Sequence, residues 1–315
     1  MRILVTGGAG FIGSNLVDRL VAAGHSVRVL DDLSSGKRSN LDGVRDQIEF
    51  IEGTILSRSD CERAIEGAEA LVHLAAMVSV PQSVEDPLFA HENNATGTVR
   101  ILDAARRAGV KRVVQASTCA VYGLEPTLPK RESMLVQPGS PYASSKMALE
   151  AYAQSFSECY GMGITSLRFF NVYGPRQDPT SPYSGVISIF LSRAVGNGKV
   201  TVFGDGSQTR DFVFVGDICQ AIERALTKEC AGANVFNVAT GRSVTLNELI
   251  ETIGQVSGRR LEATYADFRA GEIIHSSADI SAIQGGLGYQ PTVALHDGLR
   301  QTFEWYSASL ERPSV

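Results

Sequence analysis

A tyrosine and a lysine four residues apart, Tyr142 and Lys146, are the strongest candidates for chemistry in this sequence. Residues at this spacing share one face of a helix. A nearby ammonium stabilises a phenolate and so lowers the pKa of a phenol from about 10 toward neutrality, and a positively charged ring beside it would act in the same direction. The pair therefore predicts a general base near pH 7, although the same spacing also occurs on ordinary solvated helix faces.

A hydroxyl residue lies close to a predicted strand end. Thr118 follows the apolar run 112–116, and ligands of parallel sheets bind beyond the carboxyl ends of the strands. Thr118 is thus placed to hold a substrate hydroxyl between itself and Tyr142. The alternative for Thr118 is a helix cap or a turn residue.

A glycine-rich loop stands at the start of the chain, where Gly7, Gly10 and Gly13 follow a short apolar strand and precede a helical pattern. Glycines let a pyrophosphate approach the backbone, and a helix N-terminus offers it amide donors and partial positive charge. A second strand ends at Asp31 and Asp32, where Asp31 can accept hydrogen bonds from the adenosine ribose. This order predicts a dinucleotide site, and the acid favours NAD over NADP, whose 2′-phosphate it would repel. Three glycines alone are typical of many tight turns.

Strands and helices alternate through the first half of the chain. We predict strands over 2–6, 26–30, 47–51, 71–75, 112–116 and 165–169, and helices over 14–23, 88–108 and 140–160. This rhythm indicates an α/β fold with a Rossmann-type, doubly wound parallel sheet. After Phe170 the rhythm loosens. We therefore expect an NAD-binding domain over 1–170, with returning segments near 212–238, and a smaller, mixed α/β substrate lobe over 171–315.

Composition excludes several classes of protein. The chain has 315 residues, a net charge of −5 and five cysteines, none of them in a C-x-x-C pair, which is typical of reduced thiols. The negative charge argues against nucleic acid as a partner. No apolar run reaches membrane-spanning length and no signal peptide precedes the first strand. We expect a cytoplasmic protein without a membrane or nucleic-acid partner, and we identify no metal site.

Taken together, these motifs resemble the extended short-chain dehydrogenases/reductases of the nucleotide-sugar epimerase/dehydratase group, and most closely the UDP-glucose 4-epimerase type. The resemblance covers essentially the whole chain, and further motifs that carry it are Gly97-Thr98, 168–176, 204–212 and 269–272. It implies a redox-neutral cycle in which Tyr142 takes the proton of the sugar O4 hydroxyl while C4 gives a hydride to tightly held NAD. The 4-keto sugar then turns over and takes the hydride back on its opposite face. Thr118 would bond the hydroxyl, and Lys146 the cofactor ribose.

Two residues after Thr118 separate this chain from related enzymes. Sugar 4,6-dehydratases of the group carry Asp and Glu there, and UDP-glucuronate decarboxylases carry Glu at the second position. This chain has Cys119 and Ala120, which cannot do that acid–base work. Simple C4 epimerisation remains. We interpret Cys119 as a small buried residue.

The resemblance also implies the substrate contacts. Arg210 and Arg269 match diphosphate ligands, as suits guanidinium groups, and Asn171 matches a contact to the diphosphate near the sugar. Thr201 and Phe203 match the stretch that lines the uracil pocket.

Two positions bear on the nucleotide and the sugar. Glu272 matches an acid on the nucleotide ribose that is usually Asp, and Ser276 stands where a bulky Tyr excludes an N-acetyl group. We therefore predict that the substrates are the pair UDP-GlcNAc and UDP-GalNAc, the pair UDP-Glc and UDP-Gal, or both pairs. Activity as a UDP-glucuronate 4-epimerase ranks lower as an alternative. Those enzymes tend to carry Thr at the position of Asn171 and Arg at the position of Asp178. A non-catalytic NAD-binding protein, or one performing net oxidation or reduction, is a further alternative.

The remaining implied contacts belong to the cofactor. They are Phe11, Ile12, Ser35, Gly36, Thr54, Ile55, Leu74, Ala75, Ala76, Asn94 and Phe169. Thr54 replaces an Asp that accepts from the adenine amino group, and Asp32 replaces a frequent Asn. Ser79 is a further substrate candidate, with turn and cap roles open. The helices over 88–108 and 140–160 resemble those that pair across a two-fold axis, so we expect a homodimer.

Overall fold

Seven parallel strands form the central sheet of the computed structural model, which describes residues 1–179, 185–196, 198–228, 231–268 and 273–310. In spatial order they are β11 (Ala233–Val238), β6 (Gly163–Phe169), β5 (Arg112–Thr118), β4 (Ala70–His73), β1 (Arg2–Thr6), β2 (Ser26–Asp31) and β3 (Ile48–Glu52). In β1, Leu4 packs into one core while Ile3 and Val5 pack into the other. Burial on both sides explains the unbroken apolar run. The predicted Rossmann-type sheet is confirmed.

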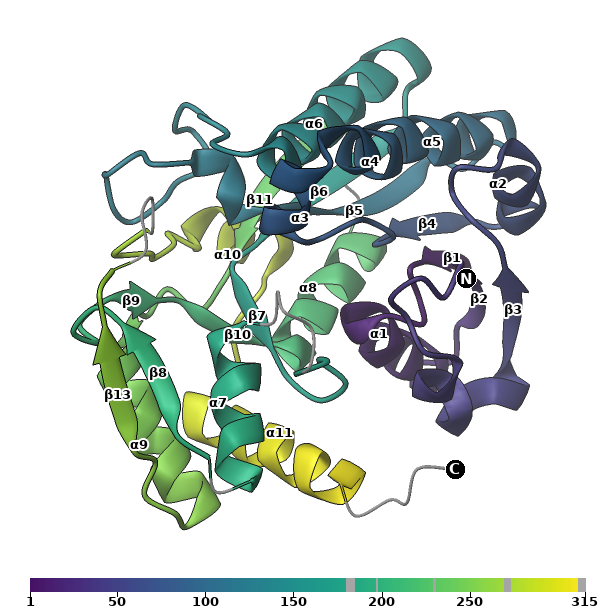
Figure 1. Ribbon diagram of the computed structural model, residues 1–315. Coiled ribbons are helices and arrows are strands. Elements are labelled where there is room, and N and C mark those ends of the chain that lie inside the picture. Colours follow the sequence, from purple (N-terminus) through teal and green to yellow (C-terminus); the bar gives the residue numbers. More distant parts are fainter. Residues whose placement is uncertain (180–184, 197, 229–230, 269–272, 311–315) are drawn as a thin grey trace.

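Helices cover both faces of the sheet (Figure 1). One face carries α1 (Phe11–Ala22), the 3₁₀ helix η1 (Arg38–Gln47) and α8 (Val215–Thr227), and the other carries α2 (Arg58–Ile65), α5 (Gly97–Arg107) and α6 (Pro141–Tyr160). The start of α6 is set by Ser140, whose hydroxyl accepts a hydrogen bond from the amide of Ala143, and its end by Gly161 in the left-handed conformation. The first is an ordinary start signal and the second an ordinary stop signal, so α6 matches the prediction over 140–160.

The helix predicted over 88–108 contains a change of helix type. The structure has α3 (Val80–Glu85), α4 (Pro87–His91), one π-helical turn η2 (Glu92–Thr96) and then α5. The predicted helical stretch is confirmed, since α4, η2 and α5 follow one another without a break, but the π-helical turn within it was not predicted. The wider turn carries Asn94 into the core, where its side chain bonds the backbone of Met77 and the hydroxyl of Ser145. Single-turn π bulges of this kind often occur near functional sites.

Short strand pairs and helices make up the rest of the described chain. The pairs are β7 (Asn171–Tyr173) with β10 (Phe212–Phe214), β8 (Val200–Phe203) with β13 (Ala263–Ala266), and β9 (Thr209–Arg210) with β12 (Val244–Thr245). The helices are η3 (Cys119–Tyr122), α7 (Val186–Val195), α9 (Leu246–Ser257), α10 (Ser281–Leu287) and α11 (Leu295–Leu310). Figure 1 shows α7, α9 and α11 gathered beside the sheet, while β11 returns to it next to β6. A domain boundary near residue 170 stays a prediction.

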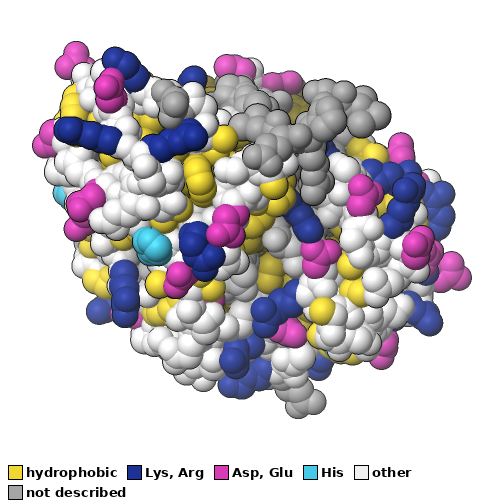
Figure 2. Space-filling model, turned by 90° about the horizontal axis from the view of Figure 1, so that it is seen from below, with side chains coloured by type: hydrophobic (Ala, Val, Ile, Leu, Met, Phe, Trp, Pro, Cys, Tyr) yellow, Lys and Arg dark blue, Asp and Glu magenta, His cyan; other side chains and the backbone are white. Residues whose placement is uncertain are grey.

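Basic and acidic side chains are interspersed on the face of the molecule drawn in Figure 2, which shows no large patch of one charge.

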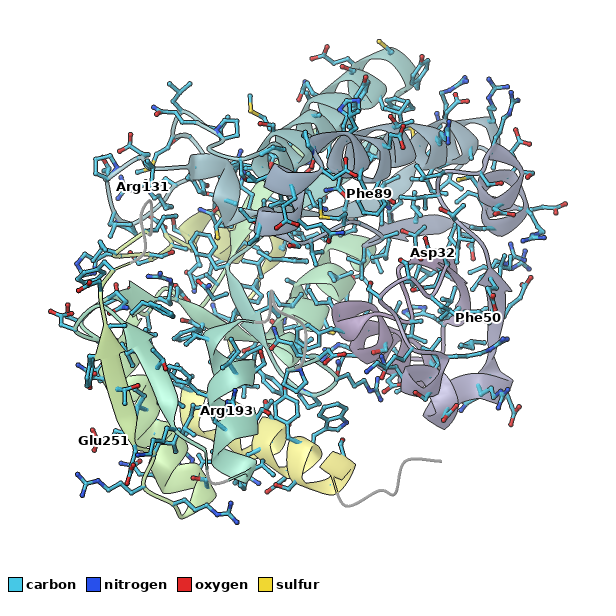
Figure 3. The ribbon with its side chains drawn as sticks, in the orientation of Figure 1. Asp32, Phe50, Phe89, Arg131, Arg193 and Glu251 are labelled. Atoms are coloured by element: carbon cyan, nitrogen blue, oxygen red, sulfur yellow. The ribbon has the colours of Figure 1, made fainter. Side chains whose placement is uncertain are left out.

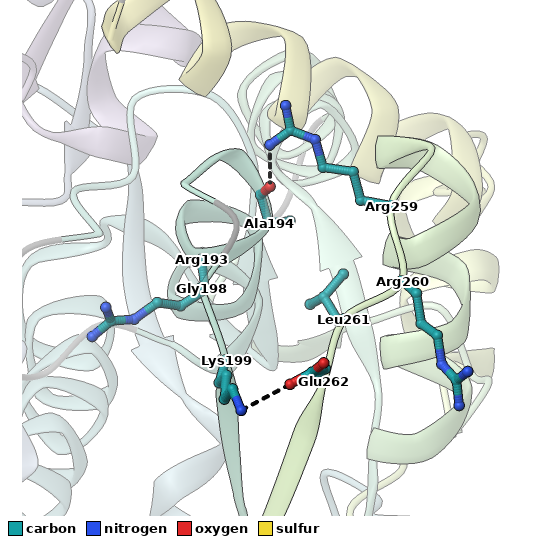
Figure 4. A pocket seen from close by; sticks show the side chains of 8 residues that line it. All are labelled: Arg193, Ala194, Gly198, Lys199, Arg259, Arg260, Leu261 and Glu262. Carbon is teal, nitrogen blue, oxygen red and sulfur yellow. Dashed lines mark hydrogen bonds and ion pairs between the residues drawn. The ribbon is translucent and has the colours of Figure 1, made fainter.

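None of the described helices combines the length and apolar composition needed to cross a bilayer. A cavity of about 320 Å³ beside the end of α7 is lined by basic residues such as Arg193 and Arg260 (Figure 4). Arg259 there donates to the carbonyls of Ala194 and Val195. This contact caps α7, and none of the lining residues is a predicted site residue.

Candidate active site

The three predicted catalytic residues converge at the carboxyl end of β5. The Thr118 hydroxyl accepts a hydrogen bond from the amide of Ala120 at 3.2 Å, which begins η3. The phenol of Tyr142, in the first turn of α6, lies within hydrogen-bonding reach of the Thr118 side chain. The ammonium of Lys146 donates to the carbonyl of Ala116 on β5 at 3.0 Å. Thr118 thus serves as a cap and also lies beside the phenol.

Burial governs the ionisation of these groups. It raises the pKa of Tyr142 to about 12, against the hydrogen bond with Thr118, which acts to lower it. Burial also lowers the pKa of Lys146 to about 8. In the chain without a bound cofactor the pKa of the phenol thus lies well above neutrality, and the general base near pH 7, which the sequence predicted from Lys146 together with a positively charged ring, stays a prediction. The physical reason is that the protein removes the water that would solvate a phenolate, while the ammonium bonds to the Ala116 carbonyl.

The glycine loop leaves no space for side chains. A Cβ on Gly13 would lie 2.1 Å from the carbonyl oxygen of Gly7, and one on Gly7, whose φ is +71°, would lie 2.7 Å from the amide nitrogen of Ala75. Helix α1 starts directly after Gly10, and no side chain in the described part of the chain caps it. Free amides at a helix N-terminus are donors for phosphate groups, so this loop fits a dinucleotide.

The acid predicted to bind the adenosine ribose is held firmly at the end of β2. Asp31 is only 8% exposed, and its two carboxylate oxygens accept from the amides of Ala9 at 2.8 Å and Leu33 at 2.9 Å. Burial raises its pKa, and the two amide bonds oppose that change. A carboxylate oxygen accepts more than one hydrogen bond, so capacity remains for ribose hydroxyls. Asp32 is exposed (Figure 3) and accepts from the amide and hydroxyl of Ser34.

The other predicted cofactor residues lie at or after the carboxyl ends of central strands, except Phe11 and Ile12. Gly36 packs on Ala9, where a Cβ would lie 2.9 Å from the Ala9 carbonyl carbon. The hydroxyl of Thr54 accepts from the amide of Leu56 at 3.2 Å, so it already has a local partner. Helix α1 begins with Phe11 and Ile12, and strand β6 ends with Phe169. Ile55 is buried and Ser35 is exposed. The segment after β4 is half-buried and contains Leu74, Ala75 and Ala76.

Two polar candidates have structural partners. Asn94 is 1% exposed, and its amide bonds both backbone groups of Met77 and the hydroxyl of Ser145. It therefore fixes the segment after β4. Ser79 caps α3 by accepting from the amide of Gln82 at 3.0 Å, which is the cap role left open by the sequence.

Segments far apart in the sequence form the predicted sugar side. The guanidinium of Arg210 donates to the carbonyls of Thr209 at 2.9 Å and Ile274 at 3.1 Å. The amide of Ser276 donates to the Thr209 carbonyl at 3.1 Å. Ser276 is thus half-buried beside β9. Asn171, at the start of β7, pairs with Phe212 of β10.

The predicted uracil-pocket residues share one face of β8, where Thr201 is exposed and Phe203 is half-buried. Arg269 and Glu272 lie outside the described residues. Asp178 forms an ion pair with Lys37 at 3.1 Å. Because a paired carboxylate repels anions less, the argument that Asp178 excludes uronates is weakened.

The loop after β7 is tied to helix α1. Arg176 has a φ of +72°, unusual for a residue with a side chain. Its guanidinium pairs with Asp18 of α1 at 2.6 Å, and the side-chain amide of Asn15 donates to the carbonyl of Pro175 at 3.1 Å. The predicted cofactor helix and the segment after Asn171 are therefore held together.

Sequence reasoning missed a buried histidine. His73 lies at the end of β4, with Nδ1 2.8 Å from the Thr6 hydroxyl and Nε2 3.0 Å from the Thr98 hydroxyl. Burial, helped by the charge of Lys146, lowers its pKa to about 3. The ring thus links β1, just before the glycine loop, to α5. A polar residue inside an otherwise apolar strand was the available signal.

Comparison with known proteins identifies the family. Residues 3–239 match the model of the NAD dependent epimerase/dehydratase family. The chain belongs to this family. A curated member, the UDP-glucose 4-epimerase of Mycolicibacterium smegmatis, is 43% identical over 310 residues, which are 97% of this chain and 98% of that protein.

Solved structures are similar over nearly the whole chain. The UDP-N-acetylglucosamine 4-epimerase from Methanobrevibacter ruminantium, in complex with UDP-N-acetylmuramic acid, has a TM-score of 0.93 and 38% identity over 98% of both chains. The UDP-glucose 4-epimerase of Thermus thermophilus, in complex with NAD, has a TM-score of 0.88 and 37% identity, covering 97% of this chain and 99% of that one. The predicted family, NAD as cofactor and the epimerase class are confirmed. The individual residue roles stay predictions.

Proposed function

We propose that this NAD-dependent epimerase inverts C4 of a UDP-hexose, with Tyr142 as the proton acceptor. The observation that carries the proposal is the convergence of Tyr142, Thr118 and Lys146 at the end of β5. In the sheet, only β4 separates β5 from β1, whose carboxyl end leads into the glycine loop. A dinucleotide on that loop would therefore extend toward the phenol across one strand end.

Each side chain has a defined task. Thr118 positions the O4 hydroxyl, Tyr142 takes its proton, and Lys146 bonds the cofactor ribose. When bound, NAD accepts a hydride from C4 and returns it to the opposite face, and its positive ring lowers the pKa of the phenol. That help matters because burial raises the pKa of Tyr142 to about 12 in the chain without cofactor.

The proposed sugars are UDP-GlcNAc and UDP-GalNAc, together with UDP-Glc and UDP-Gal. Support comes from Ser276, a small half-buried residue bonded to Thr209 beside the predicted diphosphate ligand Arg210. We expect a small side chain here to leave space for a 2-acetamido group. Because Asp178 pairs with Lys37, uronates belong in the test as well.

The deciding experiment incubates purified, NAD-loaded protein with each of the four UDP-hexoses and UDP-glucuronate, and resolves the products. We expect interconversion within both hexose pairs without free NADH. Turnover of UDP-glucuronate alone would replace the proposed substrate. Unchanged sugars throughout would remove the proposed function, and accumulation of NADH would indicate net oxidation.

We further propose that the protein forms a homodimer through the α3–α4 and α6 surface. Large apolar side chains are exposed there, with Leu88 75%, Phe89 41% (Figure 3) and Tyr152 40% accessible. Such a concentration is typical of a covered surface. Light scattering should give the dimer mass, and Leu88→Asp should reduce it to the monomer. Ile189→Asp, at an exposed apolar residue of α7, is the matched control and should leave the dimer intact.

A further inference from the structure

We propose that Arg168 keeps the carboxylate of Glu150 away from Lys146, and so leaves the Lys146 ammonium available to the catalytic phenol and the cofactor ribose. The inference rests on the proposed function, because it concerns the part that Lys146 plays there. Arg168 and Glu150 are positioning residues, since they act through Lys146.

The carboxylate of Glu150, on helix α6, is held by hydrogen bonds to two strands. Glu150 lies four residues after Lys146, on the same face of the helix. Its Oε1 accepts from the Ser117 hydroxyl at 2.5 Å and from Nε of Arg168 at 2.9 Å, while its Oε2 accepts from Nη2 of Arg168 at 2.7 Å. Both carboxylate oxygens of Glu150 therefore accept hydrogen bonds from side chains of β5 and β6. The paired hydrogen bonds from one guanidinium fix the direction of the carboxylate.

The arginine itself is well anchored. Its side chain is 6% exposed and that of Glu150 10%. The guanidinium lies 4.9 Å from the centre of the Tyr122 ring and donates to the Tyr122 hydroxyl at 2.9 Å, and this hydroxyl donates to Asn237 at 2.7 Å. Burial acts to lower the pKa of Arg168, but the bonds to Glu150 raise it overall. The guanidinium stays charged and has little freedom to move.

Three further titratable groups of the described chain lie in this part of the site. They are Tyr142 one turn earlier on α6, His73 from β4, which is affected by the charge of Lys146, and Cys119 after β5, which is close enough to affect Tyr142. Burial keeps His73 neutral by lowering its pKa to about 3, and keeps Cys119 protonated by raising its pKa to about 11. Glu150 is thus the carboxylate that matters in this corner. A buried charge requires a partner, so a Glu150 freed from Arg168 would pair with the ammonium one turn away.

The consequence concerns the pH dependence of catalysis. If Lys146 pairs with Glu150, its charge supports the phenolate of Tyr142 less, and the pKa of the catalytic phenol rises. The acidic limb of the kcat profile, below which the base is protonated, must then move to higher pH.

The test compares Arg168→Met with the double variant Arg168→Met/Glu150→Gln, using the product assay on the UDP-hexose turned over by the wild-type enzyme. In Arg168→Met we expect the acidic limb of kcat to move up by about one pH unit and kcat at pH 7 to fall about tenfold, with KM little changed. In the double variant, which removes the competing carboxylate, we expect the limb to return to its wild-type position. NAD content and thermal unfolding report whether each variant is folded.

A merely structural pair gives a different result. The double variant would then impair catalysis as much as Arg168→Met, and the acidic limb of its kcat profile would not return to the wild-type position. This outcome would overturn the inference. Arg168→Lys provides a second measurement if Arg168→Met does not fold. The ammonium introduced by this substitution can hold only one of the two Glu150 carboxylate oxygens. The acidic limb of the kcat profile should therefore shift to higher pH by less than in Arg168→Met. An unshifted limb would contradict the inference. A wild-type enzyme without turnover on any UDP-hexose removes the proposed function instead.

Discussion

The cofactor side and the sugar side of the candidate site are built in different ways. The glycine loop and Asp31 come from one contiguous βαβ unit, and close backbone packing fixes them, as the contact between Gly13 and Gly7 shows. The sugar side joins segments distant in sequence, such as Thr209 with His275. From this difference we expect that the residues predicted to face the sugar can change without disturbing the dinucleotide loop. Variants on one side should therefore alter NAD content, and variants on the other should alter the choice of sugar.

The largest effect is expected where the two sides meet. Tyr142→Phe should lower kcat by about 10²–10⁴-fold because it removes the proton acceptor, while NAD content stays at the wild-type level. Product formation and the absorbance of released NAD measure the two quantities. Tyr160→Phe, at an exposed residue at the end of the same helix, should leave both unchanged. Turnover above a tenth of wild type in Tyr142→Phe would contradict the assigned role.

A change in the glycine loop should affect the cofactor side almost as strongly. In Gly13→Ala the new Cβ meets the Gly7 carbonyl oxygen at 2.1 Å, so the loop must shift. We expect nearly complete loss of bound NAD and a decrease of about 2–3 kcal/mol in the free energy of unfolding, measured with urea. Gly285→Ala, where a Cβ meets nothing within 4 Å, is the control. Normal NAD content in Gly13→Ala would refute the steric argument.

Acid should destabilise the cofactor side through His73. Its folded pKa of about 3 lies below the ordinary 6.5, so the neutral ring contributes stability that is fully present above about pH 6.5 and is lost as the pH falls toward 3. Between pH 6.5 and 5 this amounts to about 2 kcal/mol.

Urea unfolding of His73→Gln and wild type across this range isolates that contribution. The variant should show a flatter pH dependence, whereas His296→Gln, at an exposed histidine, should follow wild type. Parallel curves for His73→Gln and wild type would show that the ring is not the source of the acid sensitivity.

The smallest effect is expected on the sugar side. Ser276→Tyr should lower kcat/KM for UDP-GlcNAc at least about tenfold relative to UDP-Glc, because one added group in a pocket typically changes discrimination by about 1–3 kcal/mol. NAD content should not change, and Ser276→Ala should behave as wild type. Equal losses for both sugars, or lost NAD, would show that the two sides are not separable.

The sequence predicted those features that depend on local patterns. The glycine spacing, Asp31 at the end of its strand and the pair formed by Tyr142 and Lys146 all follow from neighbours in the chain. The π-helical turn at Asn94 was not predictable from periodicity, since one extra residue is stabilised by contacts to distant Met77 and Ser145.

Electrostatic effects of burial were also beyond the sequence. The upward shift in the pKa of Tyr142 depends on how completely the fold removes water. The partner of Glu150 could not be chosen from local spacing either, because the i,i+4 rule favours Lys146, whereas the structure selects Arg168 from a neighbouring strand.

The contact between Arg176 and Asp18 bears on how long one molecule of cofactor stays with the enzyme. With Asn15 bonded to the carbonyl of Pro175, the loop can swing away from α1 only by separating a charge pair and a hydrogen bond. In the proposed cycle the same dinucleotide must remain through two hydride transfers. We therefore expect these two contacts to slow the exchange of bound NAD with NAD in solution, so that one cofactor molecule serves many catalytic cycles.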